Sequence, residues 1–559
     1  MPLSARAHAR VGLLGNPSDL YGGKGLGFAV AELAATVELR EGDAIAIPDG
    51  ILQGGWSLFE DVLRRRGLDP DARPFVLSAS SDIPFQSGLS GSSALLIAAM
   101  RGWSRWFGLA LGRTAIAEMA WRTENQVLGI RAGPLDRLVQ SHEGLVAMDF
   151  GDPFAEGSLE RIDPALLPPL LLAWHGQAGA SSGDVHGPIH DRWLRGDESI
   201  TRIMAALAQN AVEGRDALES RSFERFRRCI DRNFDLRREV FPIAPEDEAL
   251  VDLGRRCGAG AKFPGSGGAA LFACRDEAHR SMVEAACREA GHATLRPTVA
   301  LPTIRARAVF LAAGFATRLH PITIDRAKPL LEVGGSPIMT RLLRQVESMG
   351  AVADGLVVTN HRFHRDFEAW RDQASPSFPI AVLDDGATSN DTRLGAVRDL
   401  AFALDRADDA LGAADDVDAW LVLACDNLFE FDLARLATSF AQRGRGQLVV
   451  REVPAPVPPG KYSEVVLASD GRLIARFREK PSAPESNLSA IAVYLLPREL
   501  PTLVRTYLDG GGEGDAPGHL LAWLASRTPL EALRLDGRWL DIGSPEDLAR
   551  ADVSPQGAH

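Results

Sequence analysis

The sequence predicts an α/β protein of two domains, the second of them built on a doubly wound, mainly parallel sheet. Length is the first indication, because 559 residues exceed the single core that about 150 residues usually form. The second is a proline-containing stretch around residue 303, which separates two regions that each open on an apolar strand pattern. The third is the order strand, helix, strand in the second region, which is typical of a parallel sheet. We therefore expect one domain over residues 1–303 and another over residues 304–559.

Composition and charge exclude several kinds of protein. Hydrophobic residues make up 45% of the chain and charged residues 24%, as in globular proteins, and no apolar run approaches the roughly 20 residues of a membrane span. The N-terminal stretch lacks the apolar core of a signal peptide, and the five cysteines contain no CxxC pair. A net charge of −13 argues against a nucleic-acid surface. We expect a cytoplasmic protein with no membrane or nucleic-acid partner, for which a homo-oligomeric state stays open.

The first domain opens on a strand pattern, ARVGLLGN, that runs into an irregular loop rich in glycine and proline. Arg10 lies in this strand, and we place Lys24 in the loop. Both are predicted as catalytic cations, although single cations of this kind are more often surface charges.

A glycine-rich loop, SDIPFQSGLSGSSA, follows the next strand pattern and leads into a helical pattern from Ala94 onward. Glycines at a helix start expose N–H groups to an anion, and a serine hydroxyl there can reach a metal ion bound to phosphate. A capped helix after a flexible loop would look the same. Because no glycine-rich loop contains Gly-Lys-Ser or Gly-Lys-Thr, a P-loop is excluded. The predicted phosphate-binding residues of this loop are Gly88, Gly91, Ser92 and Ser93.

Two carboxylates, Glu124 and Asp136, lie on either side of a helix break made by two glycines and a proline. The break should bring the second carboxylate round toward the first. In a phosphate-transfer site one acid binds Mg²⁺, and the other accepts or orients the proton of the attacking hydroxyl. Further along, GAGAKFPGSGGAALFAC adds another glycine-dense loop, in which Gly265 and Gly267 are predicted to contact nucleotide.

Together these segments resemble the superfamily of galactokinase, homoserine kinase, mevalonate kinase and phosphomevalonate kinase, the GHMP kinases, over about residues 8–290. ARVGLLGNPSD is similar to the first motif of that superfamily, IPFQSGLSGSSA to the second and GAKFPGSGGA to the third, where Pro264 replaces a more usual Thr. The first two motifs, and SSGDVH at Ser181–His186, look most similar to plant glucuronokinase, which phosphorylates the anomeric hydroxyl of glucuronate.

The resemblance implies an α+β kinase domain that uses ATP. It also implies that Ser93, or Ser92, binds Mg²⁺ together with Glu124, and that Asp136 activates the sugar hydroxyl.

A uronic acid substrate would need a cation for its carboxylate, and a forked arginine suits that task. We favour Arg131, in the broken segment that delivers Asp136, over Arg137 and Lys24. A solvated charge at a helix end is an equal alternative for Arg131.

The second domain begins with the apolar run Val309–Ala313 and the small residues of a turn. Small side chains let backbone N–H groups approach an anion, and Arg318 and Lys328 add the charge that a triphosphate needs. A lone glycine after a strand would more often be an ordinary turn. The full stretch VFLAAGFATRLHPITIDRAKPLLE, however, resembles the signature loop of the sugar-1-phosphate nucleotidyltransferases, in which the Arg and Lys grip the nucleoside triphosphate. Ala316 stands where that family commonly has Gly.

Strand and helix patterns alternate after this loop, with an amphipathic helix over Ser336–Gly350 and a strand over Gly355–Asn360. In the parallel sheet that this order predicts, ligands bind beyond the carboxyl ends of the strands. Asp426 has such a position after an apolar run, and Asp541 lies just before a helix-start signal. A carboxylate at a strand end is more often only a helix cap or a turn residue.

The resemblance to the nucleotidyltransferases, over about residues 306–550, implies roles for these residues. Asp426 and Asp541 would bind Mg²⁺, and an Arg-Glu-Lys-Pro motif would place Glu479 and Lys480 at the sugar phosphate. Because the segment Asp384–Val397 departs from the usual Gln-Pro-containing loop, the identity of the base stays open. The expected nucleotide-binding residues are Leu311, Ala313, Gly314, Thr317 and Gly395.

The two halves would form one reaction sequence. ATP and a free sugar, which we expect to be glucuronate, give a sugar 1-phosphate. This attacks the α-phosphorus of a second NTP, which we expect to be UTP, to give an NDP-sugar and pyrophosphate. Positioning and charge drive such substitutions, which fits sites of Gly, Ser, Lys, Arg and carboxylates. One alternative is another sugar, such as fucose or a heptose, with GTP or another NTP. The other is that one half only binds ligands and regulates its partner.

Overall fold

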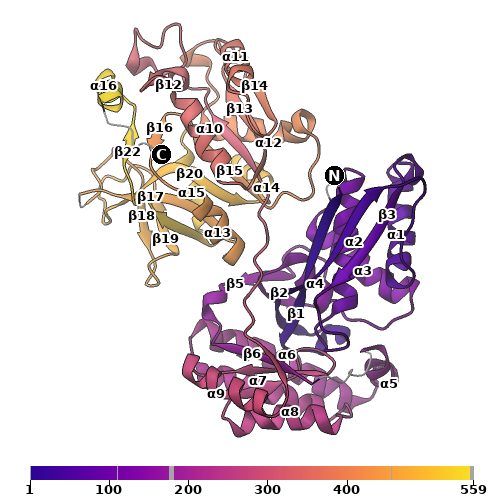
Figure 1. Ribbon diagram of the computed structural model, residues 1–559. Helices are drawn as coiled ribbons and strands as arrows, with labels where there is room; N and C mark the ends of the chain where they lie inside the picture. Colours follow the sequence, from indigo (N-terminus) through magenta and orange to yellow (C-terminus); the bar gives the residue numbers. More distant parts are fainter. Residues whose placement is uncertain (1, 110, 176–181, 455, 554–559) are drawn as a thin grey trace. The chain divides into compact units, whose positions relative to one another are not determined.

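The computed structural model describes residues 2–109, 111–175, 182–454 and 456–553 (Figure 1). The chain divides into two compact units, unit 1 over Met1–Pro302 and unit 2 over Thr303–His559. In the described part of the chain, no helix is long and apolar enough to cross a membrane.

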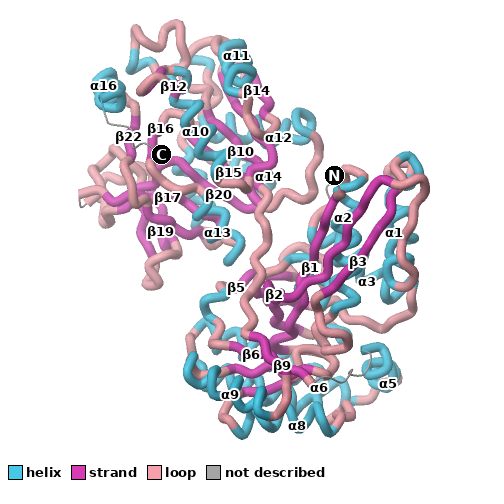
Figure 2. Tube along the Cα trace, in the orientation of Figure 1, coloured by secondary structure: helices cyan, strands magenta, loops and turns pink. Residues whose placement is uncertain are grey.

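Unit 1 contains a five-stranded antiparallel sheet organised by one long strand. The 18-residue strand β2 pairs with β1, β3 and β4, and β4 pairs with β5. Figure 2 shows β1, β2 and β3 side by side. The strands are β1 (Leu3–Leu14), β2 (Lys24–Glu41), β3 (Phe75–Ser81), β4 (Leu145–Asp149) and β5 (Leu159–Ile162). The helices of this part are α1 (Ile51–Arg65), α2 (Gly91–Trp106), α3 (Arg113–Arg122) and α4 (Leu135–His142).

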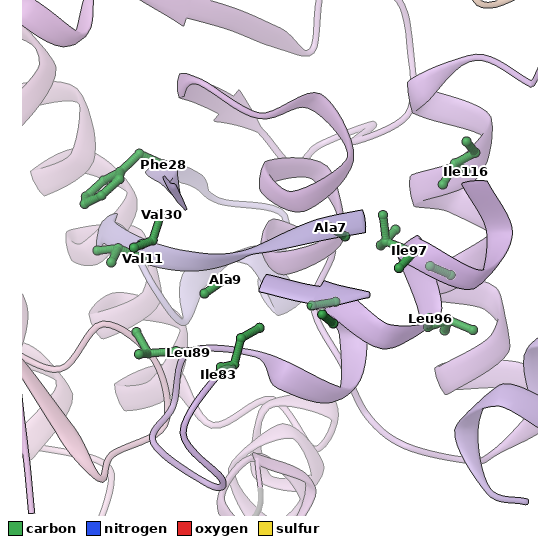
Figure 3. Close-up of a cluster of buried hydrophobic side chains, with 14 of the residues drawn as sticks. Ala7, Ala9, Val11, Phe28, Val30, Ile83, Leu89, Leu96, Ile97 and Ile116 are labelled. Atoms are coloured by element: carbon green, nitrogen blue, oxygen red, sulfur yellow. The ribbon is translucent and has the colours of Figure 1, made fainter. Parts of the chain in front are cut away.

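The core of this sheet lies between β1, β2 and α2, as Figure 3 shows in close-up. Alternate residues of β1 face this core, and three of them, Ala5, Ala7 and Ala9, are small. Figure 3 labels Ala7 and Ala9. Small residues let the helix approach closely: a Cβ added at Gly102 of α2 would lie 2.7 Å from the Leu39 side chain. The packed face of α2 therefore fixes the position of the glycine loop that precedes it.

A second antiparallel sheet in unit 1 has the strand order β7-β8-β6-β9. The glycine-dense loop of residues 263–268, which we call the third glycine loop, joins β7 to β8. All of β8 is buried, which agrees with its unbroken apolar sequence. The strands are β6 (Leu170–Trp174), β7 (Gly260–Lys262), β8 (Ala269–Ala273) and β9 (Ala293–Leu295). The helices are α5 (Ser182–Leu194), α6 (Glu198–Glu219), α7 (Phe223–Arg238), α8 (Pro245–Arg256) and α9 (Glu277–Glu289).

Unit 2 is organised by a nine-stranded mixed sheet with the main order β14-β13-β10-β15-β20-β17-β21. Four of the six neighbouring pairs in this order are parallel, and β20 is antiparallel to both neighbours. The apolar runs of β10 and β15 are almost wholly buried, as expected for parallel strands covered on both faces. The predicted α/β class, with a mainly parallel sheet in the second half, is confirmed.

The strands and helices of unit 2 follow in chain order. The strands are β10 (Ala306–Leu311), β11 (Glu332–Val333), β12 (Ser336–Pro337), β13 (Val352–Thr359), β14 (Ile380–Asp384), β15 (Ala419–Ala424), β16 (Asn427–Phe429), β17 (Gly446–Glu452), β18 (Glu464–Leu467), β19 (Ile474–Arg478), β20 (Leu488–Pro497), β21 (Leu530–Arg534) and β22 (Trp539–Asp541). The helices are α10 (Ile338–Ser348), α11 (His364–Ala374), α12 (Ala396–Leu411), α13 (Ala434–Arg443), α14 (Leu500–Asp509), α15 (Pro517–Ala525) and α16 (Pro545–Val553).

The ends of the elements differ from the sequence-based expectation at a few positions. The helix expected from Ala94 onward begins at Gly91, so its first turn contains the glycine and serines of the predicted loop. The prediction that Lys24 lies in a loop was wrong. Lys24 is the first residue of β2, because its backbone pairs with Asp149 at the end of β4.

Candidate active sites

The first site is built around Arg10 on β1 and Asp136 in the first turn of α4. Arg10 is 6% exposed, and its Nε and Nη2 donate to the two carboxylate oxygens of Asp136, the Nη2 at 2.9 Å. Its Nη1 donates to the carbonyl oxygens of Gly88 at 2.6 Å and Pro264 at 3.1 Å. One guanidinium therefore orients the predicted base and joins it to both glycine loops.

Asp136 is held on several sides but stays accessible. The Ser90 hydroxyl donates to the same carboxylate, and the Arg137 guanidinium lies 3.7 Å from it. The Asp136 side chain is still 21% exposed. Its place at the start of α4 adds the favourable end of the helix dipole. The arrangement presents an oriented carboxylate to which a substrate hydroxyl could donate its proton.

A serine and a glutamate lie together beside this carboxylate. The Ser93 hydroxyl, at the start of α2, donates to Glu124 Oε1 at 3.2 Å, and both side chains are buried. Ser92, the other serine considered for the metal, is exposed. Glu124 Oε2 forms an ion pair with Arg137 that lacks hydrogen-bond geometry. Burial and the nearby Arg10 charge lower the pKa of Arg137 to about 9.

The glycine loops of this site lie backbone against backbone. Gly88 has a φ of 70°, and a Cβ added there would lie 2.5 Å from the Gly267 carbonyl oxygen. A Cβ at Gly265 would lie 2.1 Å from the Gly88 carbonyl oxygen. No side chain fits at either position, so glycine is required by the contact between the loops.

One acidic residue near this site, Asp19, was not predicted. It follows β1 in the motif GNPSD, and its Oδ2 accepts from the Leu135 N–H at 3.3 Å, next to Asp136. A Cβ at Gly133 would lie 1.9 Å from that oxygen, so the missing side chain makes room for the carboxylate. Burial and the Asp136 charge raise the pKa of Asp19 to about 6. Its place within the first motif was the signal that could have identified it.

A buried lysine in the first site was also not predicted. Lys262, the last residue of β7, is 1% exposed, and its Nζ donates to the Gly12 carbonyl oxygen at 2.6 Å and to Asn16 Oδ1 at 2.7 Å. Burial lowers the pKa of Lys262 well below its usual range, and the Arg237 and Arg10 charges add to this effect. Lys262 therefore ties the strand that carries Arg10 to the third glycine loop.

The remaining predicted cations of unit 1 have acidic partners of their own. The half-exposed Lys24 forms an ion pair with Asp149. Arg131, whose side chain is 42% exposed, forms an ion pair with Asp191 of α5 and donates to the Gly187 carbonyl oxygen at 3.1 Å. The SSGDVH segment contributed to the resemblance to plant glucuronokinase, and its first residue, Ser181, lies outside the described residues.

The second site consists of Lys328, Asp426 and Asp541. Asp426 follows β15, and the antiparallel pairing of β16 with β22 places Asn427 opposite Asp541, which brings the two aspartates together. The Lys328 Nζ lies 3.1 Å from Asp426 Oδ2 and 3.9 Å from Asp541 Oδ1. Both aspartate side chains are 44% exposed, whereas Lys328 is buried. Burial, and then the Asp426 charge, raise the pKa of Asp541.

The predicted triphosphate loop follows β10 directly. At Gly314 an added Cβ would meet no atom within 4 Å, so this glycine faces open space. Ala316 has a φ of 46°, in the left-handed region that favours glycine. The loop is tied to the next strand by Asn360, whose Nδ2 donates to the Ala313 carbonyl oxygen at 2.9 Å. Thr317 and Arg318 are exposed on the loop, and Leu311 ends β10.

Glu479 and Lys480 lie near the second site. The Glu479 and Asp426 charges both act on the buried Tyr494, where burial first and then these charges raise the pKa of the phenol. Lys480 has a φ of 44°, and its exposed Nζ lies 3.6 Å from Glu479 Oε1. Gly395 is the residue before α12, and an added Cβ there would lie 2.7 Å from the Gly514 carbonyl oxygen.

Each site supplies few metal ligands of its own. Among the described residues, no group of three or more His, Cys, Asp or Glu side chains is placed to hold a metal ion. Mg²⁺ commonly uses one or two carboxylates and takes its other ligands from phosphate and water. Glu124 with Ser93, and Asp426 with Asp541, are oxygen donors of that kind. The Lys328 ammonium lies within 4 Å of both aspartates, so their negative charge already attracts a cation.

Comparison with known protein families divides the chain in the same way. The model of the GHMP kinases N terminal domain matches residues 56–144, and that of the GHMP kinases C terminal matches residues 215–293. The nucleotidyl transferase model matches residues 307–555.

Individual relatives cover the two halves separately. Glucuronokinase 1 of Arabidopsis thaliana is 32% identical over 53% of this chain and 92% of its own length. A mannose-1-phosphate guanyltransferase of Schizosaccharomyces pombe is 29% identical over 43% of this chain and 62% of its own. A UTP–glucose-1-phosphate uridylyltransferase of Synechocystis sp. is 28% identical over 44% of this chain and 62% of its own. The chain thus spans less than two thirds of these two transferases.

Proposed function

We propose that this chain, which belongs to the GHMP kinases over its first half and carries a nucleotidyl transferase domain in its second, converts free glucuronate to UDP-glucuronate. The two halves make it a sugar kinase and a sugar-1-phosphate nucleotidyltransferase. The observation that carries the choice of sugar is the similarity of the kinase half to glucuronokinase 1 over 92% of that protein.

In the first step the anomeric hydroxyl of glucuronate attacks the γ-phosphorus of ATP. Asp136 accepts the hydroxyl proton, and the Arg10 fork holds the carboxylate in the orientation that this requires. The new bond joins the sugar oxygen to phosphorus, the bond between the γ-phosphorus and the β-phosphate oxygen breaks, and ADP leaves. The glycine loops around Gly88 and Gly265 supply backbone N–H groups for the phosphates.

In the second step a phosphate oxygen of the sugar 1-phosphate attacks the α-phosphorus of UTP. The bond from that phosphorus to the oxygen of the β-phosphate breaks, and pyrophosphate leaves. A phosphate oxygen carries no proton that a base must remove, so the site needs positive charge more than a proton acceptor. Lys328 and Arg318 supply such charge, and Lys480 is assigned to the sugar phosphate.

Both steps use Mg²⁺ in this proposal. Ser93 and Glu124 would hold it in the kinase half, and Asp426 and Asp541 in the transferase half. When bound, Mg²⁺ neutralises phosphate charge that develops in the transition state.

A panel of free sugars tests the proposal. The full chain is incubated with ATP, one of four NTPs and one free sugar, and products are identified by mass spectrometry. We expect ADP, pyrophosphate and UDP-glucuronate from glucuronate and UTP. Glucose, galactose and fucose are the matched neutral sugars. An NDP derivative of a neutral sugar as the main product would contradict the proposed substrate.

A second candidate is the same pair of reactions on another sugar with GTP. The transferase half is similar to a mannose-1-phosphate guanyltransferase at 29% identity and to the uridylyltransferase at 28%. These values do not separate the two bases, and the segment Asp384–Val397 carries no Gln-Pro loop. The NTP arm of the same panel decides between UTP and GTP.

A further inference from the structure

An arginine near the second site is placed against two aromatic rings. Arg451 lies near the end of β17, and its guanidinium carbon is 3.8 Å from the centre of the Trp539 ring and 4.6 Å from that of Tyr462. The two rings are nearly perpendicular, with centres 6.1 Å apart. Trp539 begins β22, the strand that ends at Asp541. The cluster of Arg451, Tyr462 and Trp539 therefore adjoins the paired aspartates.

Two donors in this cluster lack acceptors. Arg451 Nη2 and Trp539 Nε1 are buried without a hydrogen-bond partner among the described residues. Within that part of the chain Arg451 forms no ion pair, and burial lowers its pKa. The Tyr462 phenol, which also shares a side-chain hydrogen bond with Arg451, and the Asp541 charge partly offset this effect, so the unpartnered donor of Arg451 is its Nη2. A buried donor without an acceptor is unfavourable, and two side by side indicate a place for an acceptor that the protein does not supply.

Two members of the cluster, Arg451 and Trp539, line a cavity of about 330 Å³, a volume in the range of small-ligand sites. Its wall contains two acidic residues, and each already pairs with an arginine: Glu452 with Arg534, and Asp536 with Arg435. Among the residues that line this cavity, Arg451 carries the positive charge that is not paired with an acidic side chain. The cavity therefore favours an anionic group over a neutral one.

We propose that Arg451 and Trp539 Nε1 bind the carboxylate of a uronate 1-phosphate in the transferase half, and so determine its preference for acidic over neutral sugars. This inference rests on the proposed function. The planar guanidinium can donate two parallel hydrogen bonds to a carboxylate, and stacking on the Trp539 ring fixes its plane. The phosphate of the same sugar is assigned to Lys480, which leaves Arg451 for the carboxylate.

The test compares two acceptors in the full chain, glucuronate 1-phosphate and glucose 1-phosphate, with UTP and with pyrophosphate release as the readout. For Arg451→Met we expect kcat/KM for glucuronate 1-phosphate to fall about 100-fold, because a paired buried charge is lost, and that for glucose 1-phosphate to fall less than about 3-fold. Arg451→Lys, which keeps the charge but not the fork, should recover part of the loss. Arg505→Met is the matched control, since Arg505 is exposed, pairs with Asp405 and does not line this cavity. It should change neither value.

Three outcomes would overturn the inference, and the third of them would also contradict the proposed function. Equal losses for both acceptors, in Arg451→Lys as well as Arg451→Met, would mean that Arg451 contacts the phosphate that they share. An unchanged preference in Arg451→Met would mean that it binds no part of the sugar. A wild-type chain that prefers glucose 1-phosphate would contradict the proposed function itself, before any variant is made. The wild-type and variant arms thus separate the two failures.

Discussion

The two candidate active sites hold their carboxylates in different ways. In the first site Asp136 receives a forked pair of bonds from the buried Arg10 and a bond from Ser90, so its orientation is fixed before any substrate binds. In the second site Asp426 and Asp541 are 44% exposed and share a single ammonium, that of Lys328. A proton acceptor must point in one direction, whereas two ligands of a cation need only lie close together. The difference agrees with the task that we propose for each carboxylate.

The largest effect should come from the fixed carboxylate. Asp136→Asn keeps the shape of the side chain but removes the proton acceptor, and we expect sugar phosphorylation to fall on the order of 10² to 10⁴-fold. Nucleotidyl transfer from supplied sugar 1-phosphate should stay near wild type, since Asp136 lies in the other unit. ADP and pyrophosphate release measure the two steps separately. Equal damage to both would contradict separate sites.

The converse change affects the paired aspartates. Asp426→Ala or Lys328→Ala should lower NDP-sugar formation by about 10² to 10³-fold, because charge stabilisation of the transition state is lost. Free sugar and ATP should then give an accumulating sugar 1-phosphate, visible by mass spectrometry. Asp432→Ala, an exposed aspartate that follows β16, is a control expected to behave as wild type. If no sugar 1-phosphate accumulated, the proposed order of steps would be wrong.

Both sites contain an acid whose pKa is raised by burial and by a neighbouring carboxylate, and Asp19 tests this feature. Its pKa is about 6 in the folded protein against an ordinary 3.8. A raised pKa in an acid contributes stability that is present below the unfolded pKa and is lost as the pH rises through 6. The loss should be on the order of 3 kcal/mol.

Thermal unfolding from pH 4 to 8 measures this contribution. The transition of the wild-type kinase half should fall to a lower temperature as the pH rises, and Asp19→Asn should flatten that dependence and stabilise the protein at pH 8. A pH dependence that is the same in both proteins would show that Asp19 ionises normally.

A smaller effect is expected at Arg131, the cation proposed for the uronate in the kinase half. Because its side chain is 42% exposed and already pairs with Asp191, Arg131→Leu should reduce kcat/KM for glucuronate by roughly tenfold, about 1.4 kcal/mol. Phosphorylation of glucose or galactose should change little. Competition of the three sugars in one reaction gives the ratios directly. An equal reduction for every sugar would show that Arg131 does not bind the carboxylate of glucuronate. Glucuronate would still be the proposed substrate.

The smallest effect concerns the second site's loop. Ala316 has a φ of 46°, and Ala316→Gly should stabilise the transferase half by about 1 kcal/mol, because glycine adopts this conformation without strain. Ala327, with a φ of −62°, is the matched position. Ala327→Gly should destabilise by a similar amount, since the unfolded chain gains flexibility and a buried methyl group is lost there. Thermal unfolding of the full chain measures both. Destabilisation by Ala316→Gly would show that the methyl group has a contact worth more than the strain.

The sequence by itself determined the classes of the two halves and the types of residue in each site. These features are local: a glycine loop before a helix, an apolar run that ends in an aspartate, and a lysine followed by proline are each readable over a short stretch. Gly88, Ser93 and Asp426 lie in such short motifs, and the resemblance of these motifs to the two families decided between a ligand-binding role and an ordinary cap or turn. The mainly parallel sheet of unit 2 could also be predicted, because alternation of strand and helix leaves few other topologies.

Only the tertiary structure decided which of these residues meet. Arg10 and Asp136 are 126 residues apart in the chain, and Lys328 and Asp426 are 98 apart. Their contacts depend on strand pairing and on the packing of α4 and β1, which no local pattern encodes. Arg451 illustrates the limit, since an arginine in a strand normally predicts a solvent-facing position. Its burial against Trp539 exists only because β17 and β22, separated in sequence, bring their side chains together.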